Sequence, residues 1–402
     1  MVASGIKMYT YRWIILALYF LITVIIEIQW LTFASISTAA QEFYQVSPLR
    51  IDFLSMIYMI VFIVLSIPAS YIIDTYGLKK GLAIGSVLTG IFSLMKAIFA
   101  DNYWGVAIAQ TGLAAAQPFI LNSVTKVGAN WFPKNERATV AGIGSLAQYV
   151  GIIIALTVTP LLILQVGEGS YNVSNMLMIY GISSVLGSLL LLIFFKEKPP
   201  TAPESVKEAA RIKPIAGMKS IFKSMDMRLL LLMFFIGLGV FNAVSTCIDQ
   251  ICSLLSMEET GIVGGIMLVG GVLGALIIPP ISDRVEKRKP FLTLCMAAML
   301  PGLLGLTYFT SFIPLMISGF IFGFFIMSAG PIGFQYGAEK SHPSPESISQ
   351  GLILLVGQVS GILFVFGVNS IGVTSSMVIF AALILINVFL TLRLSESYRT
   401  SI

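Results

Sequence analysis

Long apolar runs alternate with short polar segments along the whole chain of 402 residues. A helix that crosses a membrane needs about 20 mostly apolar residues, and runs of that length recur along the chain. We therefore predict an all-α polytopic membrane protein with twelve transmembrane helices. The predicted spans cover residues 13–38, 50–73, 81–100, 103–127, 138–164, 174–195, 229–255, 260–282, 290–310, 312–336, 347–370 and 372–392.

One polar connection is much longer than the others and separates the first six spans from the last six. The predicted organisation is an N-terminal six-helix bundle (1–195), a linker (196–228) and a C-terminal six-helix bundle (229–402). Short cytoplasmic loops collect Lys and Arg, and all of these residues except Arg50 and Lys96 fall on one side of the predicted spans. We therefore expect both termini and the linker to be cytoplasmic. Lys96, near the outer end of its span, is expected to snorkel towards the membrane surface.

The composition agrees with a membrane protein and excludes several other classes. Charged residues are 11% of the chain, against about 25% in soluble domains, and mean hydropathy is +0.93. The net charge of +5 follows from the basic loops, so we expect no nucleic-acid partner. One histidine and three cysteines in apolar stretches supply neither a metal-ligand spacing nor a nucleophile–histidine–acid set. We expect no enzyme, no metal and no cofactor, and a multi-pass protein of the cell membrane.

The two halves of the chain repeat. Asp74, which follows the second span, recurs 209 residues later as Asp283, after the eighth. A Glu followed twelve residues on by a Gln also occurs in both halves, as the pairs Glu136–Gln148 and Glu346–Gln358. Twelve spans in two parallel six-helix repeats around a midplane cavity are the organisation of the major facilitator superfamily, which the sequence resembles.

The loop after the second span resembles the signature loop of that superfamily. It reads Asp74-x-x-Gly77-x-Lys79-Lys80. Acidic and cationic groups at helix ends form charge-assisted contacts that hold one conformation closed. A solvated turn is the alternative, but the acidic and basic loop after the eighth span favours gating. The predicted gating residues are Asp74, Gly77, Lys79, Lys80, Glu136, Arg137, Asp283, Arg284 and Glu346.

An ordered set of short strings also resembles one branch of the superfamily. The strings include Gln29-Trp30, Ile51-Asp52-Phe53-Leu54-Ser55-Met56-Ile57-Tyr58-Met59, Ala116-Gln117, Trp131-Phe132, Ser245-Thr246 with Asp249-Gln250, and Gln358-x-x-Gly361. They are similar to the feline leukaemia virus subgroup C receptor-related transporters, whose members are associated with choline, ethanolamine and haem. The resemblance implies a cavity for a small organic cation that draws on Trp30, Gln148 and Gln358. The chain departs from this family's pattern at Glu27, Asn242 and Asp249.

Three ionisable residues lie well inside predicted spans: Glu27, Lys96 and Asp249. Charged groups within a membrane are costly and mark functional sites. Trp30 follows Glu27 by three residues, so both point roughly the same way, and an indole face attracts a cation by about 0.5–2 kcal/mol. We predict that both bind the cationic substrate and that Glu27 couples its transport to protons. The alternatives are a protonated packing residue at Glu27 and an interfacial or core tryptophan at Trp30.

Gln148 and Gln358 lie ten to eleven residues into their spans, close to the membrane midplane. An amide at that depth faces partners or a wet cavity, so these residues are predicted to bind substrate, with a helix-to-helix hydrogen bond as the alternative. Asp249 is a candidate for gating or coupling, or a polar end residue. Weaker candidates for substrate contact are Asn242, Gln117 and Tyr58.

The leading interpretation is a secondary active or facilitative transporter of a small, choline-like cation that works by alternating access as a monomer in the lipid bilayer. A proton-coupled exporter of lipophilic cationic drugs is the second interpretation. A carrier of haem or organic anions is the third, although no Arg or Lys is predicted at the midplane. A non-transporting receptor or scaffold would not need two charged loops at equivalent positions.

Overall fold

The structure is a computed structural model that describes residues 9–133, 136–165, 171–201, 221–341 and 346–396. The chain folds into two compact units, which are described separately. Unit 1 comprises Met1–Phe33 and Ala39–Ala209, and unit 2 comprises Ala34–Thr38 and Ala210–Ile402. The short segment 34–38 therefore belongs to unit 2, although it follows the first helix of unit 1 and includes the first two residues of the next helix, α2 (Ser37–Tyr44).

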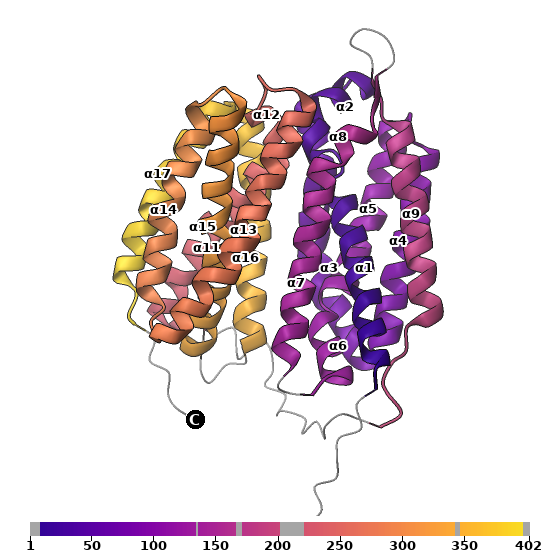
Figure 1. Cartoon of the computed structure of the whole chain (residues 1–402), viewed down its shortest axis with the longest axis horizontal. Helices are drawn as coiled ribbons and strands as arrows, with labels where there is room; N and C mark the ends of the chain where they lie inside the picture. Colours follow the sequence, from indigo (N-terminus) through magenta and orange to yellow (C-terminus); the bar gives the residue numbers. More distant parts are fainter. Residues whose placement is uncertain (1–8, 134–135, 166–170, 202–220, 342–345, 397–402) are drawn as a thin grey trace, which may run out of the picture. The chain divides into compact units, whose positions relative to one another are not determined.

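Unit 1 is a helical bundle with a small hairpin of two strands (Figure 1). Each strand has two residues, and the two strands pair antiparallel in the connection before the last helix of the unit. The elements are α1 (Tyr11–Trp30), α2 (Ser37–Tyr44), α3 (Pro48–Tyr76), α4 (Leu78–Ile98), α5 (Tyr103–Leu121), α6 (Val124–Trp131), α7 (Arg137–Thr157), α8 (Thr159–Leu162), β1 (Leu164–Gln165), β2 (Tyr171–Asn172) and α9 (Ser174–Phe194).

Unit 2 is also a helical bundle. It begins in sequence with η1, a single 3-10 turn that lies within the segment 34–38, and continues after the linker. The elements are η1 (Ala34–Ile36), α11 (Met225–Thr246), α12 (Ile248–Ile251), α13 (Met257–Val285), α14 (Lys289–Tyr308), α15 (Phe312–Lys340), α16 (Glu346–Ile371) and α17 (Val373–Arg393).

The predicted number of spans is confirmed, because the described residues contain twelve helical stretches long and apolar enough to cross a membrane. Four of the predicted spans are interrupted or end early. The predicted span 13–38 is broken after Trp30, 103–127 is divided at Asn122 and Ser123, 138–164 ends as a long helix at Thr157, and 229–255 ends at Thr246. At the second break the Asn122 side chain bonds Ser66 and Ser70 of α3. Apolar residues continue through these breaks, so hydropathy alone does not reveal them.

Helix packing repeats between the two units and confirms two six-helix repeats. In unit 1, α1 packs on α7, and α5 packs on both α3 and α4, while α4 also packs on α9. In unit 2 the corresponding pairs are α11 with α16, α15 with α13 and α14, and α14 with α17. These four helix pairings therefore occur in both units.

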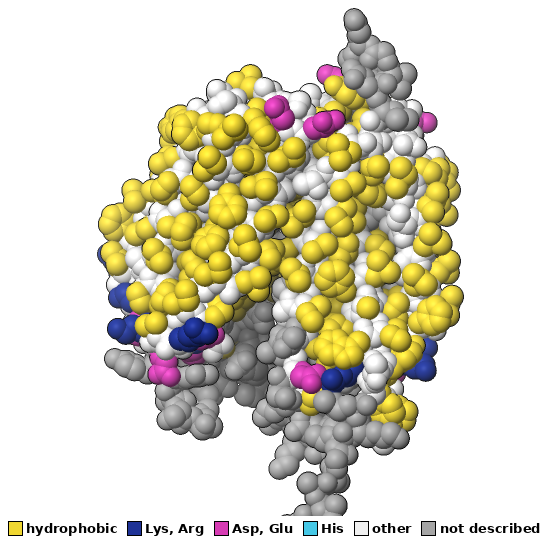
Figure 2. All heavy atoms as spheres, in the orientation of Figure 1, with side chains coloured by type: hydrophobic (Ala, Val, Ile, Leu, Met, Phe, Trp, Pro, Cys, Tyr) yellow, Lys and Arg dark blue, Asp and Glu magenta, His cyan; other side chains and the backbone are white. Residues whose placement is uncertain are grey.

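The sides of both bundles are apolar, and charged side chains gather at the helix ends. Figure 2 shows hydrophobic side chains along the helices, with Lys and Arg at one end of each bundle. Large apolar side chains such as Ile67, Ile193 and Leu276 remain exposed. This distribution suits lipid around the helices. Tyr19, Ile22 and Ile26 of α1 lie in the buried core of unit 1.

Candidate functional site

A buried carboxylate lies in the interior of unit 1. Glu27 of α1 is 1% exposed, and the Gln117 side-chain nitrogen of α5 donates to its Oε1 at 3.3 Å. On the other side α7 comes very close, since a Cβ at Gly151 would lie 2.7 Å from the Glu27 Cβ and 2.5 Å from the Val24 oxygen. Two residues that the sequence named separately, Glu27 and Gln117, therefore meet at one site.

Two buried tyrosines lie within the electrostatic reach of this carboxylate. Tyr58 of α3 and Tyr19 of α1 both interact with the Glu27 charge. The Tyr19 hydroxyl lies beside the Thr23 hydroxyl, whereas the Tyr58 hydroxyl has no hydrogen-bond partner in the described part of the chain. Tyr58 was a predicted binding residue, whereas the sequence pattern did not single out Tyr19. An unpaired buried hydroxyl is costly, so this interior has polar groups available for a further ligand or proton.

Trp30 is the last residue of α1, and α3 holds it at both its side chain and its backbone. The indole nitrogen donates to the Ser55 carbonyl oxygen at 3.2 Å, and the Ser55 hydroxyl donates to the Trp30 carbonyl oxygen at 3.3 Å. The indole is partly buried. Its orientation is therefore set by α3, whereas Glu27, three residues earlier, is held by α5 and α7.

The two predicted amides are partly buried and unpaired. Gln148 lies on α7 of unit 1 and Gln358 on α16 of unit 2, and neither side chain has a hydrogen-bond partner among the described residues. Helices α7 and α16 are counterparts in the repeat, as their packing shows. Asn242 of α11 donates to the Gly357 carbonyl oxygen at 3.3 Å, which places it beside the stretch of α16 that carries Gln358.

Asp249 lies in α12, just beyond the end of α11, and is 7% exposed. Its Oδ2 accepts from the Thr38 backbone nitrogen at 2.6 Å and from the Thr38 hydroxyl at 2.7 Å. Thr38 is part of unit 2, so this contact is internal to that unit. Burial raises the pKa of the Asp249 carboxyl, and the two hydrogen bonds from Thr38 offset part of that rise.

Lys96 contradicts the expectation that it snorkels. It lies on α4 with no exposed surface, and its ammonium donates to the Thr32 hydroxyl at 3.3 Å and to the Gln110 side-chain oxygen at 3.2 Å. It makes no ion pair with any residue that the structure describes. The long side chain turns into the bundle because hydroxyl and amide acceptors are available there.

The Asp74 carboxylate of unit 1 pairs with a distant lysine and not with the two lysines of its own loop. Asp74 pairs with Lys126 of α6 at 3.4 Å, whereas the neighbouring Lys79 and Lys80 side chains are exposed. Gly77 joins α3 to α4 with φ +106°, a backbone conformation that favours glycine. The gating prediction included Gly77 and missed Lys126, which lies 52 residues from Asp74.

Other predicted gating residues of unit 1 lie near the start of α7. Glu136 forms an ion pair with Arg12, the second residue of α1, at 3.0 Å. The side chain of Arg137 lies outside the described part, as does that of Glu346, the residue at which α16 begins in unit 2. The Arg12–Glu136 ion pair was not predicted, because the two residues are far apart in the sequence.

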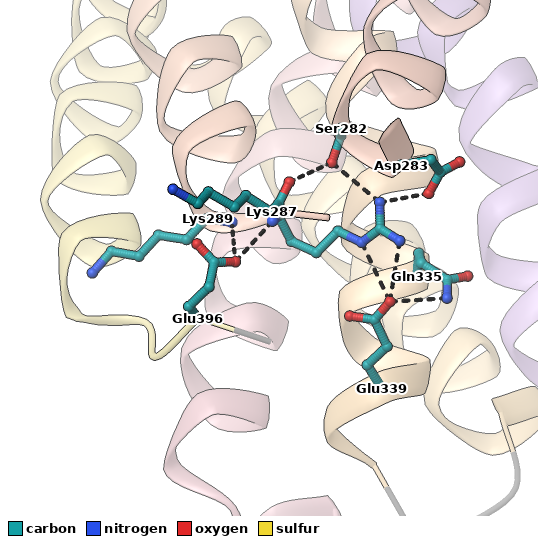
Figure 3. A network of polar contacts seen from close by, with 8 residues as sticks. Ser282, Asp283, Lys287, Lys289, Gln335, Glu339 and Glu396 are labelled. Atoms are coloured by element: carbon teal, nitrogen blue, oxygen red, sulfur yellow. Dashed lines mark hydrogen bonds and ion pairs between the residues drawn. The ribbon is translucent and has the colours of Figure 1, made fainter. Parts of the chain in front are cut away.

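In unit 2 the predicted acidic residue is paired with an unpredicted cation. The Arg288 guanidinium bridges Asp283 at 2.6 Å and Glu339 of α15 at 3.2 Å (Figure 3). Arg284, the cation of this loop that was predicted to take part in gating, is exposed and forms no ion pair with a described residue. Four cations lie between positions 284 and 289, and their order in sequence does not distinguish the buried one.

A second feature of these loops recurs in both units. Glu197 accepts from the Leu78 and Lys79 backbone nitrogens at the start of α4. Glu396 accepts from the Arg288 and Lys289 backbone nitrogens at the start of α14. Each glutamate lies three residues after the last helix of its unit. Carboxylates are favourable at helix N-termini, so the end of each bundle caps its third span.

Comparison with known proteins now decides the family. A sequence model described as the Major Facilitator Superfamily matches residues 15–365. The chain belongs to the major facilitator superfamily. It is therefore a multi-pass integral membrane protein of a family of transporters rather than enzymes, which confirms the predicted family, fold and class.

Relatives within the superfamily share the branch that the sequence motifs indicated. The chain is 29% identical over 376 residues to a protein of Felis catus named choline/ethanolamine transporter FLVCR1, covering 88% of this chain and 66% of that protein. It is 29% identical over 378 residues to the Homo sapiens choline/ethanolamine transporter FLVCR2, covering 90% and 72%. The chain thus matches about two thirds of the length of the feline relative.

Solved structures of other superfamily members share the fold. A bacterial homologue of the human lysosomal transporter Spinster, solved in an inward-facing and unoccupied conformation, has a TM-score of 0.77 at 12% identity and is covered over 97% of its length. A mutant of the nucleoside transporter NupG has a TM-score of 0.71 at 16% identity, with 94% of this chain and 99% of that chain covered. At such identities the likeness concerns the fold.

Proposed function

We propose that this transporter moves a small organic cation of the choline and ethanolamine class across the membrane by alternating access. The observation that carries the proposal is the buried carboxylate of Glu27, which accepts a side-chain hydrogen bond from the neutral amide of Gln117. A neutral amide does not neutralise a carboxylate, so an ionised Glu27 has no counter-ion among the described residues until a cation binds. The two relatives whose names specify choline and ethanolamine support the same class.

Each unit offers its own substrate-binding groups in this proposal. Unit 1 supplies the Trp30 indole face for cation–π attraction and the unpaired Gln148 amide for the substrate hydroxyl or amine. Unit 2 supplies Gln358, with Asn242 holding the adjacent backbone of α16. The bundles 1–195 and 229–402 and the linker 196–228 are the proposed domains, with both termini cytoplasmic and one chain sufficient for transport.

Proton coupling is a second candidate property, and the burial of Glu27 favours it. A proton and a substrate cation compete for the same carboxylate oxygens. An exporter of lipophilic cationic drugs would use the same group, so the identity of the transported cation must be measured separately from its coupling.

The test is uptake of radiolabelled choline into proteoliposomes that contain the purified protein, with ethanolamine, a lipophilic cation and haem as competitors. We expect choline uptake that ethanolamine inhibits and that Trp30→Ala, Gln148→Ala and Gln358→Ala each reduce about tenfold, the loss of about 1.4 kcal/mol of binding. Unaltered uptake in all three variants would remove these residues from the site. Binding of the lipophilic cation without choline uptake would favour the exporter.

A further inference from the structure

The first span of the chain ends early, and every carbonyl left over at its end is paired. Terminating an α-helix leaves its last four carbonyl oxygens without intrahelical partners. Here Leu31 N donates to Glu27 O and the Thr32 hydroxyl donates to Ile28 O. The Gln110 side-chain nitrogen donates to Gln29 O, and the Ser55 hydroxyl donates to Trp30 O. All four of these backbone carbonyl oxygens are therefore hydrogen-bonded.

Lys96 forms hydrogen bonds with two of the four residues that donate to these carbonyls, Thr32 and Gln110. Its ammonium donates to both the Thr32 hydroxyl oxygen and the Gln110 side-chain oxygen, and an ammonium group has donors but no acceptor. A lone pair of the Thr32 hydroxyl must therefore face Lys96, which directs its single hydrogen towards the end of α1, where the Ile28 and Gln29 carbonyl oxygens lie 2.8 and 3.1 Å away. The Gln110 oxygen must face Lys96 as well, which directs the NH₂ group to Gln29 O and to Leu54 O.

The charge of Lys96 is compensated at the same place. A buried cation is costly unless it is paired or hydrogen-bonded, and no carboxylate pairs with Lys96 in the described residues. The C-terminal end of α1 carries partial negative charge from its carbonyl groups and favours a nearby cation. The Phe33 ring, centred 5.6 Å from the ammonium, adds a cation–π contact. The ammonium and the end of the helix therefore stabilise each other.

The chain passes from unit 1 into unit 2 shortly after the end of α1. Trp30 is the last residue of α1, and unit 2 begins at Ala34, a few residues beyond the end of the helix. We propose that Lys96 is a positioning residue, which fixes where α1 ends and thereby places the backbone of Trp30, whose indole the Ser55 contacts of α3 then orient. The consequence for substrate rests on the proposed function, whereas the hold on the helix end does not.

The experiment measures amide hydrogen exchange of peptides covering residues 25–36 in nanodiscs, together with choline affinity, for the wild type and Lys96→Met. Methionine approximates the length of lysine but has no donors and no charge. We expect exchange of the segment to become about tenfold faster, as local opening becomes easier, and choline affinity to fall about tenfold. Ser86→Ala on the same helix, which removes a buried hydroxyl without a described partner, should change neither.

A second set of variants keeps the proposal testable if Lys96→Met does not fold. Thr32→Val removes the hydroxyl that accepts from Lys96, and Thr32→Ser keeps it, so we expect fast exchange in the first and normal exchange in the second. If Lys96 acts by orienting Gln110, the effects of Lys96→Met and Gln110→Leu on exchange should be far from additive, since residues of one network couple. Additive effects would contradict that route.

The possible outcomes separate this proposal from the proposed function. Unchanged exchange in Lys96→Met, or in Thr32→Val, overturns the role of Lys96 at the helix end. Faster exchange with choline affinity equal to the wild type overturns the link to Trp30. Faster exchange in a protein whose wild type does not bind choline leaves the positioning role intact and contradicts the choline proposal instead.

Discussion

Three buried ionisable side chains in this transporter are each stabilised in a different way. Glu27 accepts from a neutral amide, Lys96 is held by a hydroxyl, an amide and a helix end, and Asp249 accepts from the backbone and hydroxyl of one threonine. Because none of the three has an oppositely charged partner among the described residues, each remains sensitive to a change in charge nearby. That sensitivity is what a transporter needs at groups that respond to substrate, protons or conformation.

Glu27 is predicted to make cation binding depend on pH. Protons and substrate compete for its oxygens, so choline affinity should weaken as pH falls. Glu27→Gln keeps the shape and should lose about tenfold in affinity, about 1.4 kcal/mol, together with the pH dependence. Binding is measured between about pH 5 and 8, where the exposed carboxylates stay ionised. Trp30→Ala should lose affinity but retain the pH dependence.

A matched control for this experiment is Glu42→Gln, because Glu42 is an exposed carboxylate on α2. It should bind choline with wild-type affinity and pH profile. If Glu27→Gln also kept both properties, the buried carboxylate would have a structural role and the proposed coupling would fail.

Asp249 is predicted to make stability depend on pH. Burial raises the pKa of its carboxyl in the folded state, with Thr38 reducing the rise, and the Cys252 thiol is a titratable group that interacts with its charge. The folded protein then binds the proton more tightly than the unfolded chain, so stability from this group is present at low pH and is lost as pH rises through the folded pKa.

The measurement compares melting temperatures of wild type and Asp249→Asn from about pH 7.5 down to about 4.5, near the ordinary aspartate range. The wild type should gain relative to Asp249→Asn as pH falls. A constant difference across that range would mean that the carboxylate is equally hydrated in both states.

At this scale the sequence indicated polar residues within the helices but not their partners. Glu27 and Gln117 could be named because polar groups inside spans are rare, but their contact joins positions 90 residues apart. Lys96 lies near the end of its helix, as predicted, yet the direction of its side chain depends on Thr32 and Gln110, which hydropathy treats as ordinary span residues. Arg284 was chosen over Arg288 because the spacing of a cationic loop does not encode which member is buried.

At the scale of elements, helix ends organise the functional regions. α1 stops at Trp30 with two of its last carbonyl oxygens paired by side chains of α3 and α5, α12 follows a break after α11, and α4 and α14 start on carboxylates from distant segments. Span number and order were predictable because apolar runs are long and the connections are polar. The breaks were not predictable, since the groups that satisfy them come from residues remote in sequence.

The two capping glutamates are predicted to contribute similarly to stability. Glu197→Ala and Glu396→Ala each remove a carboxylate that accepts from two backbone nitrogens at a helix start, and we expect each to cost about 0.5–2 kcal/mol. Melting temperatures of the purified protein provide the comparison, with Glu42→Ala as the exposed control. A lower melting temperature in only one of the two variants would show that equivalent caps contribute unequally to stability.

At the scale of the whole molecule, the same helix pairs and the same caps recur in two units, as expected for a major facilitator fold. The charged loops recur too, but their ion pairs are unequal. The Asp74 carboxylate is 72% exposed beside Lys126, whereas the Arg288 guanidinium is 6% exposed between Asp283 and Glu339. Exposed pairs contribute about 0–1 kcal/mol, while breaking a buried pair costs about 3–5 kcal/mol.

This inequality predicts an asymmetric response of the transport cycle to loss of the ion pairs. If these loops stabilise one conformation, Arg288→Met should shift the population of conformations strongly and Asp74→Asn only slightly. A cysteine introduced at the exposed Ser145 of α7 reports the shift through labelling by a membrane-impermeant maleimide from each side of the membrane. The native cysteines are buried and give a low background.

We expect cytoplasmic labelling of this cysteine to rise much more in Arg288→Met than in Asp74→Asn. The reason is that breaking the buried Arg288 network costs more free energy than breaking the exposed Asp74–Lys126 pair. Lys223→Met, which removes an exposed cation next to the start of α11, is the control and should label like the wild type. Equal labelling in Arg288→Met and wild type would show that the buried network holds the helices of unit 2 together without biasing the cycle. A larger shift in Asp74→Asn would show that the exposed Asp74–Lys126 pair of unit 1 contributes more to the stability of this conformation than the Arg288 network does.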